Sequence, residues 1–360
     1  MIFRINMEKI LLPPHKKTKF VLLGSGNTLC NFYNLLVKND FPKPIIVTHP
    51  KKFHKRDQIL LKNTKNFIDL FEFSKINNIK VIETEKLNDI KLINQLLKFG
   101  CNAAFSISCR SIIGKEFLKS FENRVFNIHP SILPMERGAA VISWRIMNNK
   151  KYVAGTIHQI DEGIDTGKII LQLKKSLIKQ KPTVKNYSIE TDKLYNKLLL
   201  EFLKMFKKQG FCKLKKQNEK DATYFPRLYS EFNGAIDWNW EGKEIDLFIR
   251  AFGLPYPGAF SFINNDKVSI LETNFKKIKN DFHPYTYGKV IQITDDGSIK
   301  VITKNGILHI IKISNKGKIL EPGKIIKLAD TFYTPIDILK NSKIKTMNIK
   351  DMMKPKSRGK

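Results

Sequence analysis

Residues 125–170 of this 360-residue chain hold three polar side chains that could do chemistry together. Asn127 and His129 stand two residues apart at the end of a short apolar run, and Asp165 lies in a later Asp-rich loop. Because successive side chains of a strand alternate between its faces, the amide and the imidazole should point the same way. A carboxylate beside an imidazole fixes its tautomer and favours its protonated form, and an amide N–H can donate to an oxyanion.

This combination suits the transfer of an acyl group to an amine. The amide and the imidazolium would stabilise a tetrahedral oxyanion, while Asp165 and His129 would manage the protons. A Ser or Cys nucleophile is unnecessary, because the amine is itself the nucleophile. The alternative is a loop in which Asn127 and His129 are satisfied by backbone groups, and spacing alone leaves both interpretations open.

Alternating strands and helices precede these residues and would position them. The predicted strands are 19–23, 44–48, 80–83 and 103–107, and the predicted helices between them are 29–37, 60–77 and 89–99. Such alternation predicts a doubly wound, mainly parallel sheet, in which ligands bind beyond the carboxyl ends of the strands. Residues 106–113 and 127–134 follow two such ends, so we expect them to meet in one cleft.

The second half of the chain has a different pattern. An amphipathic helix is predicted at 191–208, and the Lys-rich stretch 209–221 is expected to be a linker. A further helix is expected to open at Ile236-Asp237-Trp238 and to run to Phe252. From Gly288 onward, short strands are separated by Asp296-Gly297 and Asn305-Gly306, which are strong hairpin signals. These features predict a small antiparallel β-barrel.

The composition is that of a globular chain with a large basic excess, a net charge of +31. A nucleic-acid partner would account for this charge. An AT-rich genome would also account for it, since only nine of the 64 basic residues are arginines and phosphate recognition favours arginine. The sequence leaves both explanations open.

Targeting signals and paired cysteines are not evident in the sequence. No apolar run reaches about 18 residues, and the N-terminus lacks the apolar core of a signal peptide, so we expect a cytoplasmic protein without a membrane span. The four cysteines, Cys30, Cys101, Cys109 and Cys212, form no CxxC pair. We expect buried thiols and no metal site.

The central segment resembles a known family. Asn127–Pro134, then Arg137-Gly138, then Asp165-Thr166-Gly167 are similar to the signature of the 10-formyltetrahydrofolate-dependent formyltransferases. The resemblance implies 10-formyltetrahydrofolate as co-substrate, no metal, and catalytic positions at Asn127, His129 and Asp165. It implies direct attack of an amine on the formyl carbon, with Asp165 helping to relay the amine proton to the folate N10.

The same resemblance implies where the ligands bind. The expected folate contacts are Ser106, Ile107, Ser108, Cys109, Ile112, Ser131, Asp161 and Gly163. The expected contacts to the amine acceptor are Arg137, Gly138, His49, His54 and Arg56. The three residues after the second strand could equally form a solvated basic loop.

The C-terminal half resembles the second domain of the two-domain members, an OB-like barrel. The similar segments are Ala222–Arg227, Ile236–Trp238, Ile249–Phe252 and Pro257–Phe260. The expected organisation is an N-terminal extension at 1–17, a formyltransferase domain at 18–208, a linker at 209–221, an OB-like domain at 222–335 and a basic tail at 336–360.

Two acceptors are compatible with this resemblance. Methionyl-tRNA formyltransferases usually carry Gly-Thr-Pro in the first turn and a long basic loop after the second strand. Here the turn is Gly24-Ser25-Gly26, and the segment Thr48–Asp57 is short. It looks more like that of sugar-amine formyltransferases, so we expect a nucleotide-linked amino sugar, with initiator methionyl-tRNA as the alternative. The basic C-terminal region favours the tRNA.

Two other classes are also compatible with parts of the sequence. A formyltetrahydrofolate hydrolase would use the same three residues with water as the acceptor, but it normally has a regulatory domain ahead of the catalytic one. With 17 residues before Thr18, we do not expect such a domain here. A non-catalytic RNA-binding protein would explain the charge but would give Asn127, His129 and Asp165 no purpose.

Overall fold

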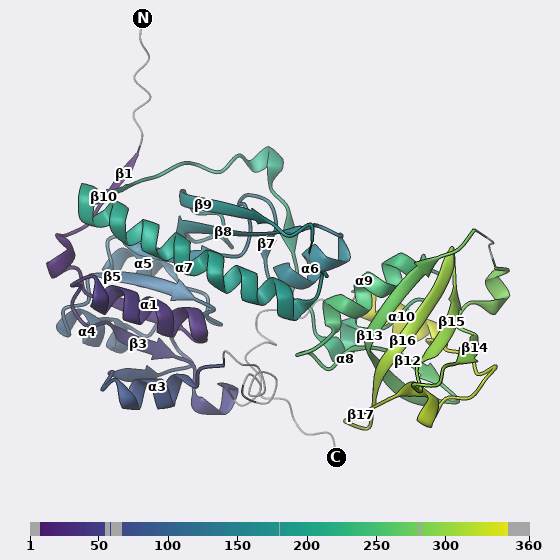
Figure 1. Cartoon of the computed structure of the whole chain (residues 1–360). Coiled ribbons are helices and arrows are strands. Elements are labelled where there is room, and N and C mark those ends of the chain that lie inside the picture. Colours follow the sequence, from purple (N-terminus) through teal and green to yellow (C-terminus); the bar gives the residue numbers. More distant parts are fainter. Residues whose placement is uncertain (1–7, 55–57, 59–66, 180, 280–281, 345–360) are drawn as a thin grey trace, which may run out of the picture. The chain divides into compact units, whose positions relative to one another are not determined.

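The computed structural model describes residues 8–54, 58, 67–179, 181–279 and 282–344 (Figure 1). The chain forms two compact units. Unit 1 comprises Met1–Arg137, Tyr152–Leu177 and Ile189–Tyr224, and unit 2 comprises Gly138–Lys151, Ile178–Ser188 and Phe225–Lys360. Within the described residues, no helix has both the length and the apolar character needed to cross a membrane.

Unit 1 is built on a seven-stranded sheet in the order β4-β3-β2-β5-β6-β8-β9. Its strands are β2 (Phe20–Gly24), β3 (Ile45–Thr48), β4 (Val81–Glu83), β5 (Ala103–Ile107), β6 (Val125–His129), β8 (Tyr152–Gln159) and β9 (Ile169–Ser176). The strands from β4 to β6 are parallel, whereas β8 runs antiparallel to β6 and β9 antiparallel to β8. The predicted doubly wound, mainly parallel sheet is confirmed. Its strand order reverses between β2 and β5, where such folds bind their ligands.

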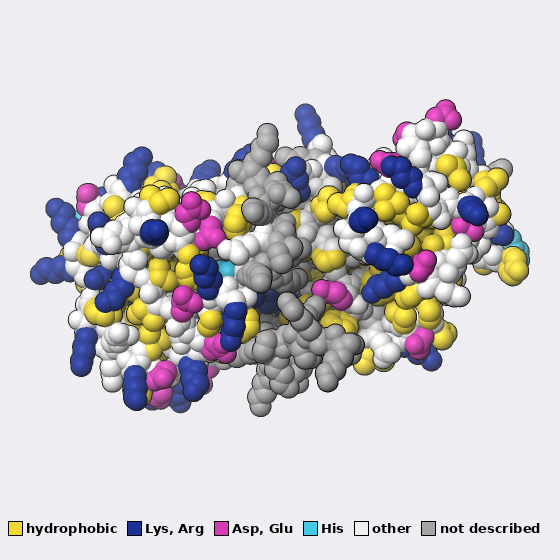
Figure 2. Space-filling model, turned by 90° about the horizontal axis from the view of Figure 1, so that it is seen from below, with side chains coloured by type: hydrophobic (Ala, Val, Ile, Leu, Met, Phe, Trp, Pro, Cys, Tyr) yellow, Lys and Arg dark blue, Asp and Glu magenta, His cyan; other side chains and the backbone are white. Residues whose placement is uncertain are grey.

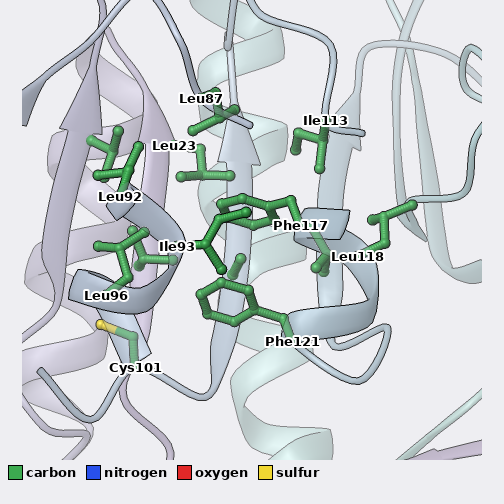
Figure 3. Close-up of a cluster of buried hydrophobic side chains, with 14 of the residues drawn as sticks. Leu23, Leu87, Leu92, Ile93, Leu96, Cys101, Ile113, Phe117, Leu118 and Phe121 are labelled. Carbon is green, nitrogen blue, oxygen red and sulfur yellow. The ribbon is translucent and has the colours of Figure 1, made fainter. Parts of the chain in front are cut away.

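Helices cover both faces of this sheet (Figure 1). They are α1 (Asn27–Lys38), α3 (Leu70–Ile76), α4 (Ile90–Lys98), α5 (Lys115–Ser120) and α7 (Val184–Gln209). On one face, strand residues such as Val21 and Leu23 pack with Ile93 and Phe117 of α4 and α5 in one buried cluster (Figure 3). Alternate strand residues point to the other face, where Phe105 contacts Phe32 of α1 and Phe202 of α7 at ring-centroid distances of 4.7 and 5.6 Å.

A second, two-stranded sheet belongs to unit 1. Strand β1 (Lys9–Leu11) pairs antiparallel with β10 (Phe211–Lys213). The 3-10 helices η1 (His15–Lys17) and η2 (Glu219–Asp221) lie beside these strands in the sequence. The segments expected to be an N-terminal extension and a linker therefore each contribute a strand to unit 1.

Unit 2 is organised around an antiparallel sheet. Its strands are β12 (Ala259–Ile263), β13 (Asp266–Lys277), β14 (Val290–Ile293), β15 (Ile299–Thr303), β16 (Gly306–Asn315) and β17 (Lys318–Leu320). The edge strand β12 and the residue before β14 both bridge to residues 331–333, through Phe262–Tyr333 and Lys289–Thr331. These bridges close the sheet into the expected barrel.

Short helices complete unit 2. They are α6 (Val141–Met147), α8 (Ser230–Asn233), α9 (Gly242–Phe252), α10 (Ile336–Ile344), η3 (Pro284–Thr286) and η4 (Pro322–Lys324). The helix expected from Ile236 begins only at Gly242, because Glu241 and Glu244 form a capping box at that point. Helix α6 packs in unit 2, where the Ser143 hydroxyl donates to the Ala251 carbonyl at 2.8 Å. The short strands β7 (Arg137–Gly138) and β11 (Tyr224–Phe225) form a further two-stranded sheet.

Candidate active site

Asn127, His129 and Asp165 come together at the carboxyl end of β6. The carboxylate of Asp165 lies between the other two side chains. Its Oδ1 is 3.4 Å from Asn127 Nδ2, and its Oδ2 is 3.4 Å from His129 Nδ1. The His129 and Asp165 side chains are only 5% and 13% exposed, so little water competes with these contacts. Two nitrogen donors thus converge on one carboxylate, and both contacts are long enough for a stronger acceptor to replace them.

The other edge of the His129 ring is anchored. Its Nε2 lies 2.7 Å from the backbone carbonyl of Glu136, which can only accept. With a carbonyl at Nε2 and a carboxylate at Nδ1, these contacts accommodate a ring that carries a proton on each nitrogen. Glu136 and Asp165 both have left-handed backbones, with φ of 59° and 55°, so two unusual conformations flank the imidazole.

His158 is a further site residue, which the sequence analysis did not single out. It is 2% exposed on β8, and its Nε2 lies 3.1 Å from Asn127 Nδ2 and 3.5 Å from Asp165 Oδ1. Because its Nδ1 faces the carbonyl of Gln159 at 2.9 Å, the ring proton belongs on Nδ1. Nε2 is then an acceptor that orients the Asn127 amide. The antiparallel pairing of Asn127 with His158 would have revealed this neighbour.

The loop that carries Asp165 is closely folded. Asp161 Oδ1 accepts from the Gly163 amide at 3.1 Å and from the Thr166 hydroxyl at 2.5 Å. A Cβ on Gly163 would lie 2.1 Å from the Thr166 hydroxyl, and one on Gly167 would lie 1.7 Å from the Gln159 carbonyl. The glycines are therefore required for the turn that brings Asp165 to His129.

The residues expected to contact folate border the same strand ends. Ser106 lies beside Asn127, because the two residues are paired in the parallel register of β5 and β6. Ile112, in the loop after β5, keeps 48% of its surface exposed, and Ile164, in the loop before β9, keeps 40%. An ion pair between Lys115 and Glu162, with 3.8 Å between the charged atoms, connects the two regions. Binding of the pterin ring at these loops stays a prediction.

Four other expected folate contacts are constrained by hydrogen bonds, burial or an unusual backbone conformation. Ile107 accepts a 3.1 Å hydrogen bond from the Ser25 amide, and Ser108 has a left-handed backbone with φ of 54°. The Cys109 thiol is partly buried and donates to the Ser111 carbonyl at 3.5 Å. Ser131 is fully buried, and its hydroxyl donates to the Met135 carbonyl at 2.7 Å. A direct folate contact through these four residues stays a prediction.

The expected acceptor residues fall in two places. His49 and His54 stack on each other after β3, with ring centroids 3.8 Å apart, and His54 Nε2 lies 3.1 Å from the Thr48 hydroxyl. Burial, reinforced by His54 and Arg110, lowers the pKa of His49 to about 3, so its ring is neutral at pH 7. Its Nε2 is buried and has no hydrogen-bond partner among the described residues. Arg56 lies outside the described residues.

Arg137 and Gly138 form β7, and the Arg137 side chain is 8% exposed. Its guanidinium donates to Gln217 and Glu219. Direct binding of the acceptor by Arg137 stays a prediction.

The cysteines and the possible metal ligands were the remaining candidates for chemistry. Burial raises the pKa of the Cys30 and Cys212 thiols to about 12 and that of Cys101 to about 11, which keeps them protonated. In the part of the chain that the structure describes, no group of three or more His, Cys, Asp or Glu residues could hold a metal ion.

Family models match both units. The formyl transferase model matches residues 17–203, and the model of the formyl transferase C-terminal domain matches residues 230–329. The chain belongs to the formyltransferase family. It is a one-carbon transferase that uses 10-formyltetrahydrofolate as the formyl donor.

Several relatives of this formyltransferase are known by name. It is 28% identical over 303 residues to the methionyl-tRNA formyltransferase of Buchnera aphidicola, covering 84% of this chain and 93% of the relative. It is 30% identical over 272 residues to that of Fusobacterium nucleatum, covering 74% and 86%. It is 29% identical over 314 residues to the bifunctional polymyxin resistance protein ArnA of Wigglesworthia glossinidia, covering 82% and 45%.

Solved structures share the fold. The N-formyltransferase of Helicobacter canadensis, solved with folinic acid and dTDP-3-aminofucose, has a TM-score of 0.60 and 21% sequence identity, and the match covers 81% of this chain and 98% of that one. The predicted family and fold are therefore confirmed.

Proposed function

We propose that this formyltransferase formylates the amine of a nucleotide-linked amino sugar, with Asn127, His129 and Asp165 as its catalytic residues. The convergence of Asn127 Nδ2 and His129 Nδ1 on the Asp165 carboxylate, each at 3.4 Å, is the observation that carries the chemistry. Donors that converge on one point can stabilise an oxyanion that forms there.

The proposed reaction is a direct transfer. The acceptor amine attacks the formyl carbon, and the carbonyl oxygen becomes an oxyanion that takes the N–H donors of Asn127 and His129. The Asp165 carboxylate, released from these donors, accepts a proton from the attacking amine. The bond from the formyl carbon to N10 then breaks, and N10 receives that proton through Asp165 or a water molecule. No covalent enzyme intermediate is needed.

The segment after β3 supports a sugar nucleotide as the acceptor. Residues 51–54, which directly follow His49 and Pro50, are helical and hold no glycine or proline, unlike the long loop of the tRNA enzymes. The neutral ring of His49, one of the residues expected to contact the acceptor, suits a hydroxyl or a base edge better than a strongly charged phosphate. Named structural relatives include a protein solved with dTDP-3-aminofucose.

A second acceptor, initiator methionyl-tRNA, is favoured by different observations. The relatives from Buchnera and Fusobacterium are methionyl-tRNA formyltransferases, and they match over most of their length. The net charge of +31 would attract RNA. On the face drawn in Figure 2, however, Lys and Arg side chains are scattered among Asp, Glu and apolar side chains and form no continuous stripe.

A formyl-transfer assay distinguishes the two acceptors. The purified protein is given 10-formyltetrahydrofolate and either initiator methionyl-tRNA or a panel of nucleotide-linked amino sugars, at one salt concentration. We expect a formylated sugar with kcat/KM at least 100-fold above that for the tRNA. Formylation of the tRNA alone would reject the sugar acceptor but keep the transfer chemistry. The variant His49→Phe should raise KM for the sugar more than it changes kcat.

A further inference from the structure

A buried glutamine connects the loop of Asp165 to the rest of unit 1. Gln217 is 5% exposed, and its Nε2 donates to the carbonyls of Asp165 and Gly167 at 2.8 and 2.7 Å. These two carbonyls flank the turn that presents the Asp165 carboxylate. Gln217 therefore acts directly on the backbone that aims this carboxylate at His129.

The glutamine is itself fixed by an arginine. Gln217 Oε1 accepts from Arg137 Nη2 at 2.8 Å and from Arg137 Nε at 3.2 Å. Arg137 also donates to both carboxylate oxygens of Glu219, at 2.8 and 2.9 Å. The acceptor side of the amide is thus held by a cation, which determines that its NH2 group faces the Asp165 loop.

These contacts form a closed ring around His129. On one side, His129 Nε2 contacts the carbonyl of Glu136, the residue that precedes Arg137. On the other side, His129 Nδ1 contacts the carboxylate of Asp165, whose backbone carbonyl is held by Gln217. The left-handed backbones of Glu136 and Asp165 are both adjacent to this Arg137–Gln217 pair, which helps to hold them in place.

We propose that Gln217, held by Arg137, is a positioning residue that sets the geometry between Asp165 and His129. The proposal rests on the proposed function, because it requires Asp165 to act in the transfer. It also assigns Arg137 a task other than direct contact with the acceptor. Gln217 lies outside the reacting groups and should influence turnover only through Asp165.

The test is a pair of substitutions measured alone and together. Gln217→Leu removes both donors and the acceptor at similar volume, and Asp165→Asn removes the carboxylate. We expect Gln217→Leu to lower kcat about 10- to 100-fold, as is usual when a supporting shell is lost. In the Asp165→Asn background it should lower kcat by less than about 2-fold, because the group that it positions is already disabled.

A matched control separates positioning from loss of stability. Asn102 is also an amide that cross-links backbone groups, since it accepts from the Lys19 amide at 3.1 Å and donates to the Lys17 carbonyl at 2.8 Å, at the opposite end of β5. Asn102→Leu should lower Tm but keep kcat within about 2-fold of the wild type. Unchanged kcat in folded Gln217→Leu, or effects of the two substitutions that multiply, would overturn the positioning role. Full activity of Asp165→Asn would instead overturn the proposed function.

Discussion

The contact between His158 and Asn127 leads to a sharp prediction about transfer rate. His158 presents Nε2 to the Asn127 amide at 3.1 Å, and His158 is 2% exposed while Asn127 is partly buried. Replacing His158 by Leu removes this acceptor. The Asn127 amide then loses the partner that holds one of its N–H groups, and the other N–H is no longer aimed at the reacting oxygen.

The expected loss follows from the energy of one partly buried hydrogen bond. Leaving a buried polar group without its partner costs about 1–3 kcal/mol. If that cost falls on the oriented transition state, kcat drops roughly 5- to 160-fold, since about 1.4 kcal/mol corresponds to a factor of ten. The KM for 10-formyltetrahydrofolate should change less, because the ground state relies little on this amide.

The matched variant is His158→Gln. Both substitutions lose the 2.9 Å contact to the Gln159 carbonyl, but a glutamine amide oxygen can reach the place of Nε2 and accept from Asn127. Steady-state release of tetrahydrofolate, measured for both variants at equal folded fraction, should show recovery in His158→Gln. Equal rates for His158→Leu and the wild type, or equal losses in both variants, would refute the assigned orientation.

Three further outcomes are expected. Gly167→Ala should lower kcat more than tenfold, since its Cβ would lie 1.7 Å from the backbone carbonyl of Gln159. Gly114→Ala, whose Cβ would first meet the Asn88 side chain at 3.1 Å, should stay near wild type. Because the pKa of folded His49 is lowered from 6.5 to about 3, the unfolded chain takes up a proton first, so the free energy of unfolding should fall between pH 6.5 and 3 more in the wild type than in His49→Gln. Urea titrations at several pH values measure this, and parallel curves would contradict it. Phe202→Ala, which empties the space beside Phe105 and Phe126, should cost about 3–5 kcal/mol of unfolding free energy by the same method.

Local patterns predicted the parallel part of unit 1 well. The run Ala103–Ile107 is β5 without change of bounds, and the hairpin signals at Asp296 and Asn305 separate β14 from β15 and β15 from β16. Such elements are specified by apolar runs and turn residues close in sequence. Asn127 and His129 could be predicted as site residues because they lie at the end of one strand, and the resemblance to the family signature supplied Asp165.

Contacts between distant segments could not be predicted in this way. Gln217 lies 80 residues after Arg137, in a Lys-rich stretch whose composition indicated only a linker. His158 becomes a neighbour of Asn127 only through antiparallel pairing of β8 with β6, which the alternating pattern of strands and helices did not reveal. Helix α6 packs in unit 2 through side chains such as Ser143, and no local signal assigns it there.

The most direct test of the central claim is a single-turnover measurement of formyl transfer by His129→Gln. Enzyme in excess over 10-formyltetrahydrofolate is mixed with the acceptor found in the assay, and tetrahydrofolate is followed in time. His283→Gln, at an exposed histidine of unit 2, is the control. If Asn127, His129 and Asp165 carry the reaction, His129→Gln should lose at least about 100-fold in rate while keeping its Tm and its folate binding. A folded His129→Gln protein that transfers the formyl group as fast as the control would contradict the account.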